Sequence, residues 1–214
     1  MLRNMPRSAD PAVRTALVEA AARMLASREA VTARSLAQRT GTSTTALYTH
    51  FGGMPGLWRA VRQEGFTRLG RQLEAVPRTD DPVQDLAALG AGYVAAAVRE
   101  PHLYRAMFDA AVELEDPAAA DATFGALVET AGRAARAGRF TADAADVATR
   151  FWMAGHGLAM LVLTAVLPAD VIRAHGQELA VGVFVAAGDD PARCRESVRR
   201  GWESTGPVGA PASG

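Results

Sequence analysis

The sequence lacks several features that would assign it to a chemical or cellular class. Its 214 residues include one cysteine, Cys194, so no disulfide can form within the chain and a reducing, cytoplasmic location is expected. Aromatic residues make up only 6% of the chain, and there is no lysine, so all 23 basic residues are arginine. The formal net charge is zero, and attraction to a charged partner therefore requires an uneven distribution of charge.

Long hydrophobic runs are also missing. The most apolar run, 151–167, has 17 residues, contains a histidine and ends at Pro168. A membrane-spanning helix needs about 20 residues, so we expect a buried helix here and no membrane partner. The first ten residues contain arginines with no apolar run behind them, and no signal peptide is expected.

Signals for catalysis or metal binding are absent from the sequence. The four histidines have no metal-ligand spacing, and no Gly-x-Ser-x-Gly elbow occurs. The run GAGYVA at 90–95 imitates a dinucleotide-binding fingerprint, but it lies in a predicted helix with no strand before it. We therefore predict no enzyme activity, no catalytic residues, no metal and no cofactor. A small helical enzyme stays open as the less favoured alternative.

What the sequence does contain is helical periodicity through almost its whole length. Caps, prolines and glycines divide it, and no segment has strand periodicity or repeats another. The predicted fold is all-α, with a helix-turn-helix domain at 1–55, a larger helical regulatory and dimerisation domain at 56–203 and a disordered tail at 204–214. The expected helices cover about 11–27, 33–40, 43–51, 57–76, 82–100, 102–111, 117–138, 142–167, 169–187 and 191–203.

The charge is distributed unevenly. Residues 1–78 contain 12 arginines and five acidic residues, a net charge of +7, whereas 79–214 contain 11 arginines and 18 acidic residues, a net charge of −7. A basic first third is typical of a nucleic-acid-binding segment. Chance asymmetry is the alternative, and it is less favoured because a separate motif lies in the same segment.

That motif is the stretch TARSLAQRTGTSTTALYTHF at 32–51. Thr32 is a good N-cap for a first short helix, and Gly41 can end it in the left-handed conformation. A second helix can begin after Thr42 or Ser43, with apolar residues four apart turned inward. Two short helices joined by a glycine turn predict a helix-turn-helix, whose outer face carries hydroxyl groups.

Three segments resemble the TetR family of transcriptional regulators. The Leu-Tyr-x-His-Phe ending at 47–51 is characteristic of that family's recognition helix. GYVAAAVREPHLYRAMF at 92–108 and WMAGHG at 152–157 resemble one class of its regulatory domains, the Trp-His-Gly type. The resemblance implies a homodimer, repression at a palindromic operator in double-stranded DNA, and release by a small, largely apolar effector of unknown identity.

The resemblance and the residue chemistry together predict a DNA-binding face. Hydroxyl groups suit phosphates and base edges because they donate and accept hydrogen bonds. Alternative interpretations stay open: Tyr48 at the edge of the core, His50 as a C-cap and the threonines as solvated surface. The predicted DNA-binding residues are Arg34, Thr42, Ser43, Thr44, Thr45, Tyr48, Thr49 and His50.

One position departs from the family. Met54 stands where many members have a phosphate-binding lysine, and either Arg59 or Arg62 is available to compensate. A chain that has kept only ligand binding and lost its DNA-binding role is therefore another alternative. The predicted ligand-binding set is Tyr93, Tyr104, Met107, Phe108, Phe124, Trp152 and His156.

A dimer interface is expected from the helix predicted at 142–167. This helix is apolar nearly all round, and such a helix is buried on every side. A domain of this size rarely covers one helix completely, so a second copy of the chain is expected to cover part of it. The apolar segment 179–187 would contribute a second helix to that interface.

Overall fold

The computed structural model describes residues 10–108 and 113–206, and every regular element in these ranges is helical. The predicted all-α fold class is therefore confirmed. The chain forms two compact units. Unit 1 comprises the residues up to Phe66 together with His102–Pro117, and unit 2 comprises Thr67–Pro101 and the residues from Ala118 onward.

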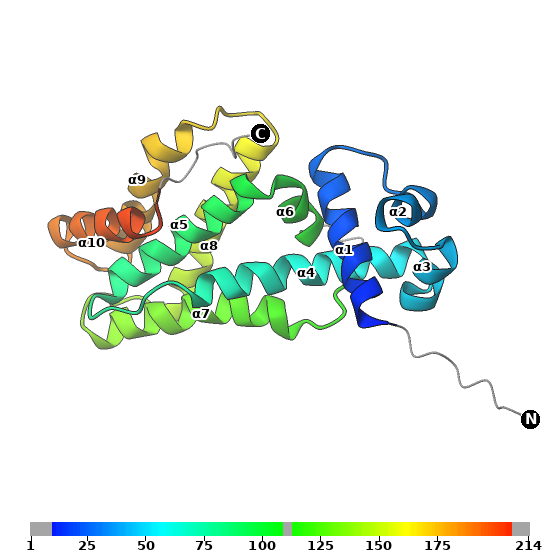
Figure 1. Cartoon of the computed structure of the whole chain (residues 1–214). Helices are drawn as coiled ribbons and strands as arrows, with labels where there is room; N and C mark the ends of the chain where they lie inside the picture. Colours follow the sequence, from blue (N-terminus) through cyan, green and yellow to red (C-terminus); the bar gives the residue numbers. More distant parts are fainter. Residues whose placement is uncertain (1–9, 109–112, 207–214) are drawn as a thin grey trace, which may run out of the picture. The chain divides into compact units, whose positions relative to one another are not determined.

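Unit 1 is built from short helices around a leucine-rich core. It contains α1 (Pro11–Ala26), α2 (Ala33–Thr40), α3 (Thr44–Phe51), the first turns of α4 (Met54–Glu74) and nearly all of α6 (Pro101–Met107). In Figure 1, α1 to α3 are drawn in blue to cyan. Side chains from five helices form the core, and the largest of those that are almost inaccessible to solvent are Leu17, Met24, Leu36, Leu47, Leu57 and Val61.

Unit 2 packs four helices against a central one. The central helix is α5 (Pro82–Arg99), and its neighbours are α7 (Ala118–Arg136), α8 (Ala144–Leu163), α9 (Val171–Ala186) and α10 (Pro191–Ser204). The remaining turns of α4 also belong to this unit. Small residues allow close approach: a Cβ added at Gly201 of α10 would lie 2.4 Å from the carbonyl oxygen of Gln84 on α5.

A buried ionic cluster joins four segments of unit 2. The Arg139 guanidinium forms two hydrogen bonds to Asp189, of 2.6 and 2.7 Å, and one of 2.9 Å to Asp81. The Ser197 hydroxyl also donates to Asp81, at 2.6 Å. Burial by itself would raise the pKa of Asp81, but the hydrogen bond from Ser197, backbone amides and Arg139 outweigh it and hold the pKa below its usual value.

Most helix boundaries lie within two residues of those expected, but the start of α4 and the end of α8 differ by three and four residues. The helix expected from 57 begins at Met54, because Pro55 suits the first turn of a helix. The helix expected to reach 167 ends at Leu163, and Ala165 adopts a left-handed φ of 59°. The predicted domain boundary after residue 55 also precedes the division between the units, which falls within α4, because Leu57 and Val61 complete the core of unit 1.

One face of α8 is exposed within a single chain. Met153 is 61% exposed and Leu161 41%, so this apolar helix is not covered on every side by its own unit. Leu179 on the adjacent α9 is 42% exposed. None of the helices in the described ranges combines the length and apolarity needed to span a bilayer. Residues 207–214 of the predicted tail, and the end of the helix expected at 102–111, lie outside the described residues.

Candidate functional site

The turn between α2 and α3 is defined by local hydrogen bonds. Thr32 caps α2 and exchanges hydrogen bonds with Ser35, whose backbone N–H donates to the Thr32 hydroxyl at 3.1 Å. Gly41 ends α2 with a left-handed φ of 67°, and Ser43 caps α3 by accepting from the Ala46 amide. The helix-turn-helix geometry therefore follows from short-range interactions in the stretch that predicted it.

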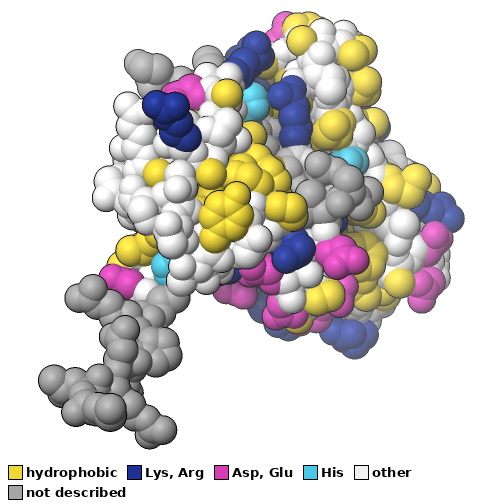
Figure 2. Space-filling model, turned by 90° about the vertical axis from the view of Figure 1, so that its right-hand side faces the viewer, with side chains coloured by type: hydrophobic (Ala, Val, Ile, Leu, Met, Phe, Trp, Pro, Cys, Tyr) yellow, Lys and Arg dark blue, Asp and Glu magenta, His cyan; other side chains and the backbone are white. Residues whose placement is uncertain are grey.

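Buried and exposed residues lie on opposite sides of α3. Leu47 and Phe51 are buried in the core of unit 1, with Leu36 of α2 beside them. Tyr48 is 62% exposed and Thr45 also faces solvent. Figure 2 views the molecule from the side on which α2 and α3 lie in Figure 1, and much of this surface is white, the colour of the backbone and of side chains that are neither hydrophobic nor charged. Of the eight predicted DNA-binding residues, Thr42 and His50 are half-buried and the other six are exposed.

Two of the predicted hydroxyl groups donate their protons within the protein. The Thr40 hydroxyl donates to the Leu36 carbonyl at 2.8 Å, so Thr42 must donate in the 2.8 Å contact between the two threonine hydroxyls. The Thr49 hydroxyl donates to the Thr45 carbonyl at 3.0 Å. Toward a ligand, Thr42 and Thr49 therefore offer only acceptor lone pairs and a methyl group.

Thr44 and Thr45 differ from these residues. Both are exposed, and neither hydroxyl forms a hydrogen bond within residues 10–108 and 113–206. Each can still donate and accept. They lie at the first two positions of α3, where the positive end of the helix dipole also favours an anion.

Tyr48 and His50 lie nearer the end of α3. A Cβ added at Gly53 would lie 3.5 Å from the Tyr48 ring, so the ring lies close to the backbone of Gly53. The turn at this point begins at Gly52, which has a φ of 68°. Gly52, not His50, is the C-cap of α3. The exposure of Tyr48 places it outside the core, which removes the alternative of a core-edge side chain.

The arginines of unit 1 fall into two groups. Arg39 is paired with Glu29, and the Arg62 Nε donates to the Met107 carbonyl at 2.7 Å. Arg34 and Arg59 are exposed and have no ion pair or hydrogen bond within the described ranges. Arg59 is therefore better placed than Arg62 to supply the cation that the family has at position 54. Met54 itself packs against the core.

Four of the predicted ligand-binding residues form one aromatic cluster in unit 2. The Trp152 Nε1–H donates to the Tyr93 hydroxyl at 3.2 Å, and that hydroxyl lies 3.1 Å from His156 Nδ1. The ring of Phe124 meets Trp152 edge-on at 6.1 Å. Burial lowers the pKa of His156, so its ring is neutral at pH 7 and Nδ1 can accept the Tyr93 proton.

The other three predicted ligand-binding residues belong to unit 1. Tyr104 and Met107 are buried on α6, and the rings of Tyr104 and Phe108 lie 5.0 Å apart. A Cβ added at Gly65 would lie 2.3 Å from Met107 Cγ, so Met107 packs tightly onto α4. The seven residues predicted as one ligand-binding set therefore belong to two different compact units of the structure.

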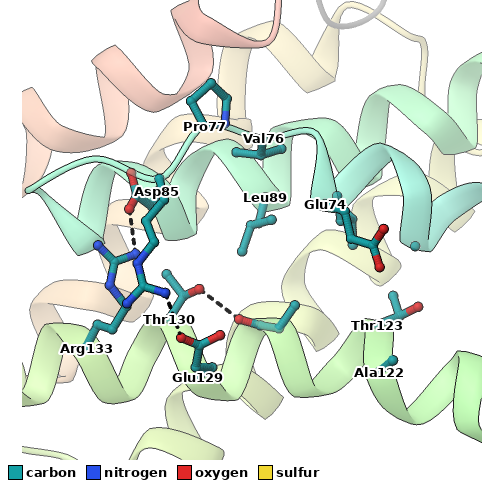
Figure 3. Close-up of a pocket in the computed structure, with 14 residues that line it drawn as sticks. Glu74, Val76, Pro77, Asp85, Leu89, Ala122, Thr123, Glu129, Thr130 and Arg133 are labelled. Carbon is teal, nitrogen blue, oxygen red and sulfur yellow. Dashed lines mark hydrogen bonds and ion pairs between the residues drawn. The ribbon is translucent and has the colours of Figure 1, made fainter.

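A cavity of about 230 Å³ lies in unit 2 between the end of α4, α5 and α7. Figure 3 shows Leu89 of α5 and Glu74 of α4 directed toward α7. None of the seven predicted ligand-binding residues lines it. No sequence motif predicts this cavity, because its lining comes from three helices and from the connection between α4 and α5. Lining residues include Leu73, Glu74, Arg78, Asp85, Leu89, Thr123, Ala126, Glu129, Thr130 and Arg133.

Comparison with known families gives one match. The family described as "Tetracyclin repressor-like, C-terminal domain" matches residues 86–197, which is more than half of the chain. This description does not specify the Trp-His-Gly type, which stays a prediction. Comparison with curated proteins gives no match.

Solved structures share the fold. A Rhodococcus sp. RHA1 protein of unknown function is 23% identical with a TM-score of 0.65, over 92% of this chain and 98% of that chain. RolR in complex with resorcinol is 20% identical with a TM-score of 0.60, over 94% and 97% of the two chains. An ArpA-like gamma-butyrolactone receptor is 20% identical with a TM-score of 0.60, over 92% and 98%. At these identities the likeness concerns the fold alone.

Proposed function

This chain belongs to the TetR (tetracyclin repressor-like) family, and we propose that it is a cytoplasmic, homodimeric repressor that binds a palindromic operator and is released by a small effector. The observation that supports DNA binding best is the outer face of α3. It presents two threonines with unused hydroxyl protons and an exposed tyrosine on a helix held firmly by its buried side.

The proposed contacts divide into two kinds. Thr44 and Thr45 meet base edges in the major groove, because their hydroxyls can donate and accept and their methyl groups fit thymine methyls. Tyr48 and His50 meet phosphates, together with Arg34 and the amides at the start of α3. Thr42 and Thr49 contribute as acceptors, whereas Ser43, whose Oγ accepts from the Ala46 amide, can still donate its proton. Phosphate contacts supply affinity, whereas base contacts supply sequence preference.

The proposed dimer interface is the exposed apolar face of α8 and α9. Met153 and Leu161 are eight residues apart on α8 and therefore lie on one side of it. Leu179 is exposed on α9, which packs against α8. A Cβ added at Gly157 or Gly182 would meet nothing within 4 Å, so both helices present glycines at which another backbone can approach closely.

The proposed effector acts through the spacing of the two DNA-binding units. A dimer must hold its two recognition helices about 34 Å apart to reach successive major grooves. An effector that binds within the helical regulatory region and favours another spacing would weaken operator binding. The structural neighbours whose names include resorcinol and gamma-butyrolactone suggest a small organic molecule of largely apolar character.

The test is fluorescence anisotropy with the purified protein and DNA fragments that flank its own gene, at two salt concentrations. Random DNA is the reference. We expect tight, salt-sensitive binding to one flanking fragment, with a log–log salt slope of about −0.9 for each phosphate that an arginine neutralises. Equal affinity for every fragment and random DNA would contradict a site-specific regulator.

Variants separate the two kinds of contact. Tyr48→Ala is expected to weaken binding to specific and random DNA by similar factors, because one phosphate contact is lost, and to leave the salt slope unchanged, because a phenol hydroxyl, unlike an arginine, releases no counterion from the DNA. The same anisotropy assay checks both quantities. A change of sequence preference with unaltered binding to random DNA would show that Tyr48 contacts bases instead.

A second candidate is a helical ligand-binding protein that has lost its DNA-binding role. It is favoured by Met54, which packs into the core, and by Arg62, which is bonded to a backbone carbonyl. Position 54 therefore has no cation, and the Arg62 guanidinium is already engaged within the protein. Absence of salt-sensitive binding to any DNA, including random DNA, would support this candidate over the regulator.

A further inference from the structure

The cavity of unit 2 has hydroxyl groups that can only accept hydrogen bonds. The Thr123 hydroxyl donates to the Ala119 carbonyl at 2.9 Å, and the Thr130 hydroxyl donates to the Ala126 carbonyl at 2.8 Å. A hydroxyl has one proton, so each of these two groups offers only lone pairs to a ligand.

The basic groups of the cavity already have acidic partners. Arg133 is 14% exposed and donates to Asp85 at 2.7 Å and to the Thr79 carbonyl at 2.6 Å. Arg78 is paired with Glu129 at 3.1 Å, and both of these side chains are largely exposed. A buried pair such as Arg133–Asp85 is costly to separate, whereas an exposed pair is weak and can be opened by a competing ion.

Glu74 is the unpaired charge. It forms no hydrogen bond or ion pair with any residue that the structure describes, and Figure 3 shows its carboxylate directed toward α7. Glu74 is the last residue of α4, where the negative end of the helix dipole also favours a cation. With Asp85 and Glu129, the lining contains three carboxylates against two guanidinium groups.

The rest of the lining is apolar. Leu73 and Leu89 are buried, and Ala126 is half-buried on α7. Glu74 and Glu129 are both exposed, so the carboxylates lie at the solvent side of the cavity and the leucines lie deeper. A ligand that fits this arrangement has an apolar body and a charged, hydrogen-donating end.

We propose that this cavity binds a small organic cation, with the apolar body against Leu73 and Leu89 and the ammonium group at Glu74 and Glu129. Binding of a cation in this cavity does not depend on the proposed function. Only the identification of this cation as the effector rests on the proposed function. The volume of about 230 Å³ suits a single-ring amine. An ammonium group supplies donors to an acceptor-rich site, and an anion would meet the unpaired carboxylate.

The experiment is isothermal titration calorimetry on the full chain with benzylamine, and with benzyl alcohol and benzoate as neutral and anionic molecules of similar shape. We expect benzylamine to bind most tightly, benzyl alcohol more weakly and benzoate not measurably at millimolar concentration. Glu74→Gln should weaken benzylamine binding about fivefold, since one exposed charge pair is lost. Glu178→Gln, an exposed glutamate of α9, is the matched control and should leave the affinity unchanged.

A second variant tests the cavity itself. Ala126→Leu adds volume to the lining and should abolish binding of benzylamine, whereas the isosteric Glu74→Gln change leaves the shape intact. Benzoate binding as tightly as benzylamine, no effect of Glu74→Gln, no benzylamine binding, or full binding in Ala126→Leu would each overturn the proposal.

The anisotropy assay separates this proposal from the regulator. If the protein binds operator DNA specifically but does not bind benzylamine, the cation inference fails and the regulator stands. If benzylamine binds in the cavity and no DNA is bound, the cation site stands and the regulator fails. Release of operator DNA by benzylamine in wild type, but not in Ala126→Leu, would support both proposals together.

Discussion

For single residues, the hydrogen bonds of the hydroxyl protons distinguish threonines that look alike in the sequence. Four threonines lie at or just before α3, yet Thr42 and Thr49 donate to neighbouring groups in the protein. Thr44 and Thr45 do not, so of these four threonines only Thr44 and Thr45 can still act as donors to DNA. Base preference should therefore depend on Thr44 and Thr45 more than on the other two.

A pair of isosteric variants tests this difference. Thr45→Val should reduce the ratio of specific to random DNA affinity about fivefold, the effect of one lost hydrogen bond of about 1 kcal/mol. Thr49→Val removes a hydroxyl whose proton is already bonded to Thr45 and should change the ratio by less than about twofold. Anisotropy titrations measure both ratios, and equal losses in the two variants would contradict the proton assignment.

A second residue-scale prediction concerns His156. Burial lowers the pKa of His156 in the folded protein below 6.5, the ordinary value that applies in the unfolded chain. At pH values between these two pKa values, the unfolded chain therefore binds more protons than the folded protein. Stability should therefore fall as the pH decreases through 6.5, and His156→Gln should reduce that loss. Melting temperatures at pH 5.5 and 7.5 measure the effect.

The control for this prediction is His175→Gln, which changes an exposed histidine of α9 and should retain the pH dependence of wild type. His102, whose pKa is lowered by burial and by Arg105 and Arg28, should account for part of the loss that remains. The assignment to His156 would be wrong if His156→Gln and wild type lost the same stability between the two pH values.

At the scale of elements, the connection from α3 to α4 determines how the recognition helix is supported. Gly52 and Gly53 have φ values of 68° and 125°, which permit the sharp reversal after Phe51. The first turn of α4 then approaches the end of α3 so closely that a Cβ at Gly56 would lie 1.8 Å from the Phe51 carbonyl oxygen. The obstacle is backbone, which cannot move aside as a side chain can.

Gly56→Ala should accordingly destabilise the protein by about 2 kcal/mol, the usual cost of overpacking, although alanine is the better helix former. Gly125→Ala on α7 is the matched control, because a Cβ there meets nothing within 4 Å. That change should stabilise the protein by about 0.5–1 kcal/mol. Urea denaturation measures both, and a neutral or stabilising Gly56→Ala would show that α3 and α4 are held less tightly.

At the scale of the whole molecule, the exposed apolar face of α8 and α9 has no cover from the described part of its own chain. Exposed side chains such as Met153 and Leu179 are typical of an interaction surface when they gather on neighbouring helices. A two-fold dimer would bury them and would also give two DNA-binding units for the two half-sites of a palindrome.

Sedimentation at micromolar concentration should therefore give twice the 22.5 kDa mass of one chain. Leu179→Glu places a charge in the proposed interface and should shift the mass toward that of a single chain. Tyr48→Glu introduces the same charge at an exposed side chain of unit 1 and should leave the dimer intact. A mass of 22.5 kDa for wild type would exclude the proposed interface at that concentration.

Features that depend on neighbours along the chain could be predicted from the sequence. Thr32, Gly41 and Ser43 end or begin helices through hydrogen bonds and backbone angles within a few residues, so the helix-turn-helix could be predicted from its letters. The all-α class followed from periodicity, and the family from the motif around Tyr48. The Trp-His-Gly type, the DNA contacts and the effector stay predictions.

Contacts between residues far apart in the sequence could not be predicted and depend on how the helices pack. Arg139 joins Asp81 and Asp189, and Glu74 lies in a cavity with Glu129, because helices far apart in the sequence pack at particular angles. No local pattern encodes those angles, which depend on the fit of whole helix surfaces. For the same reason the predicted ligand-binding set was divided between two units, and the described cavity contained none of its members.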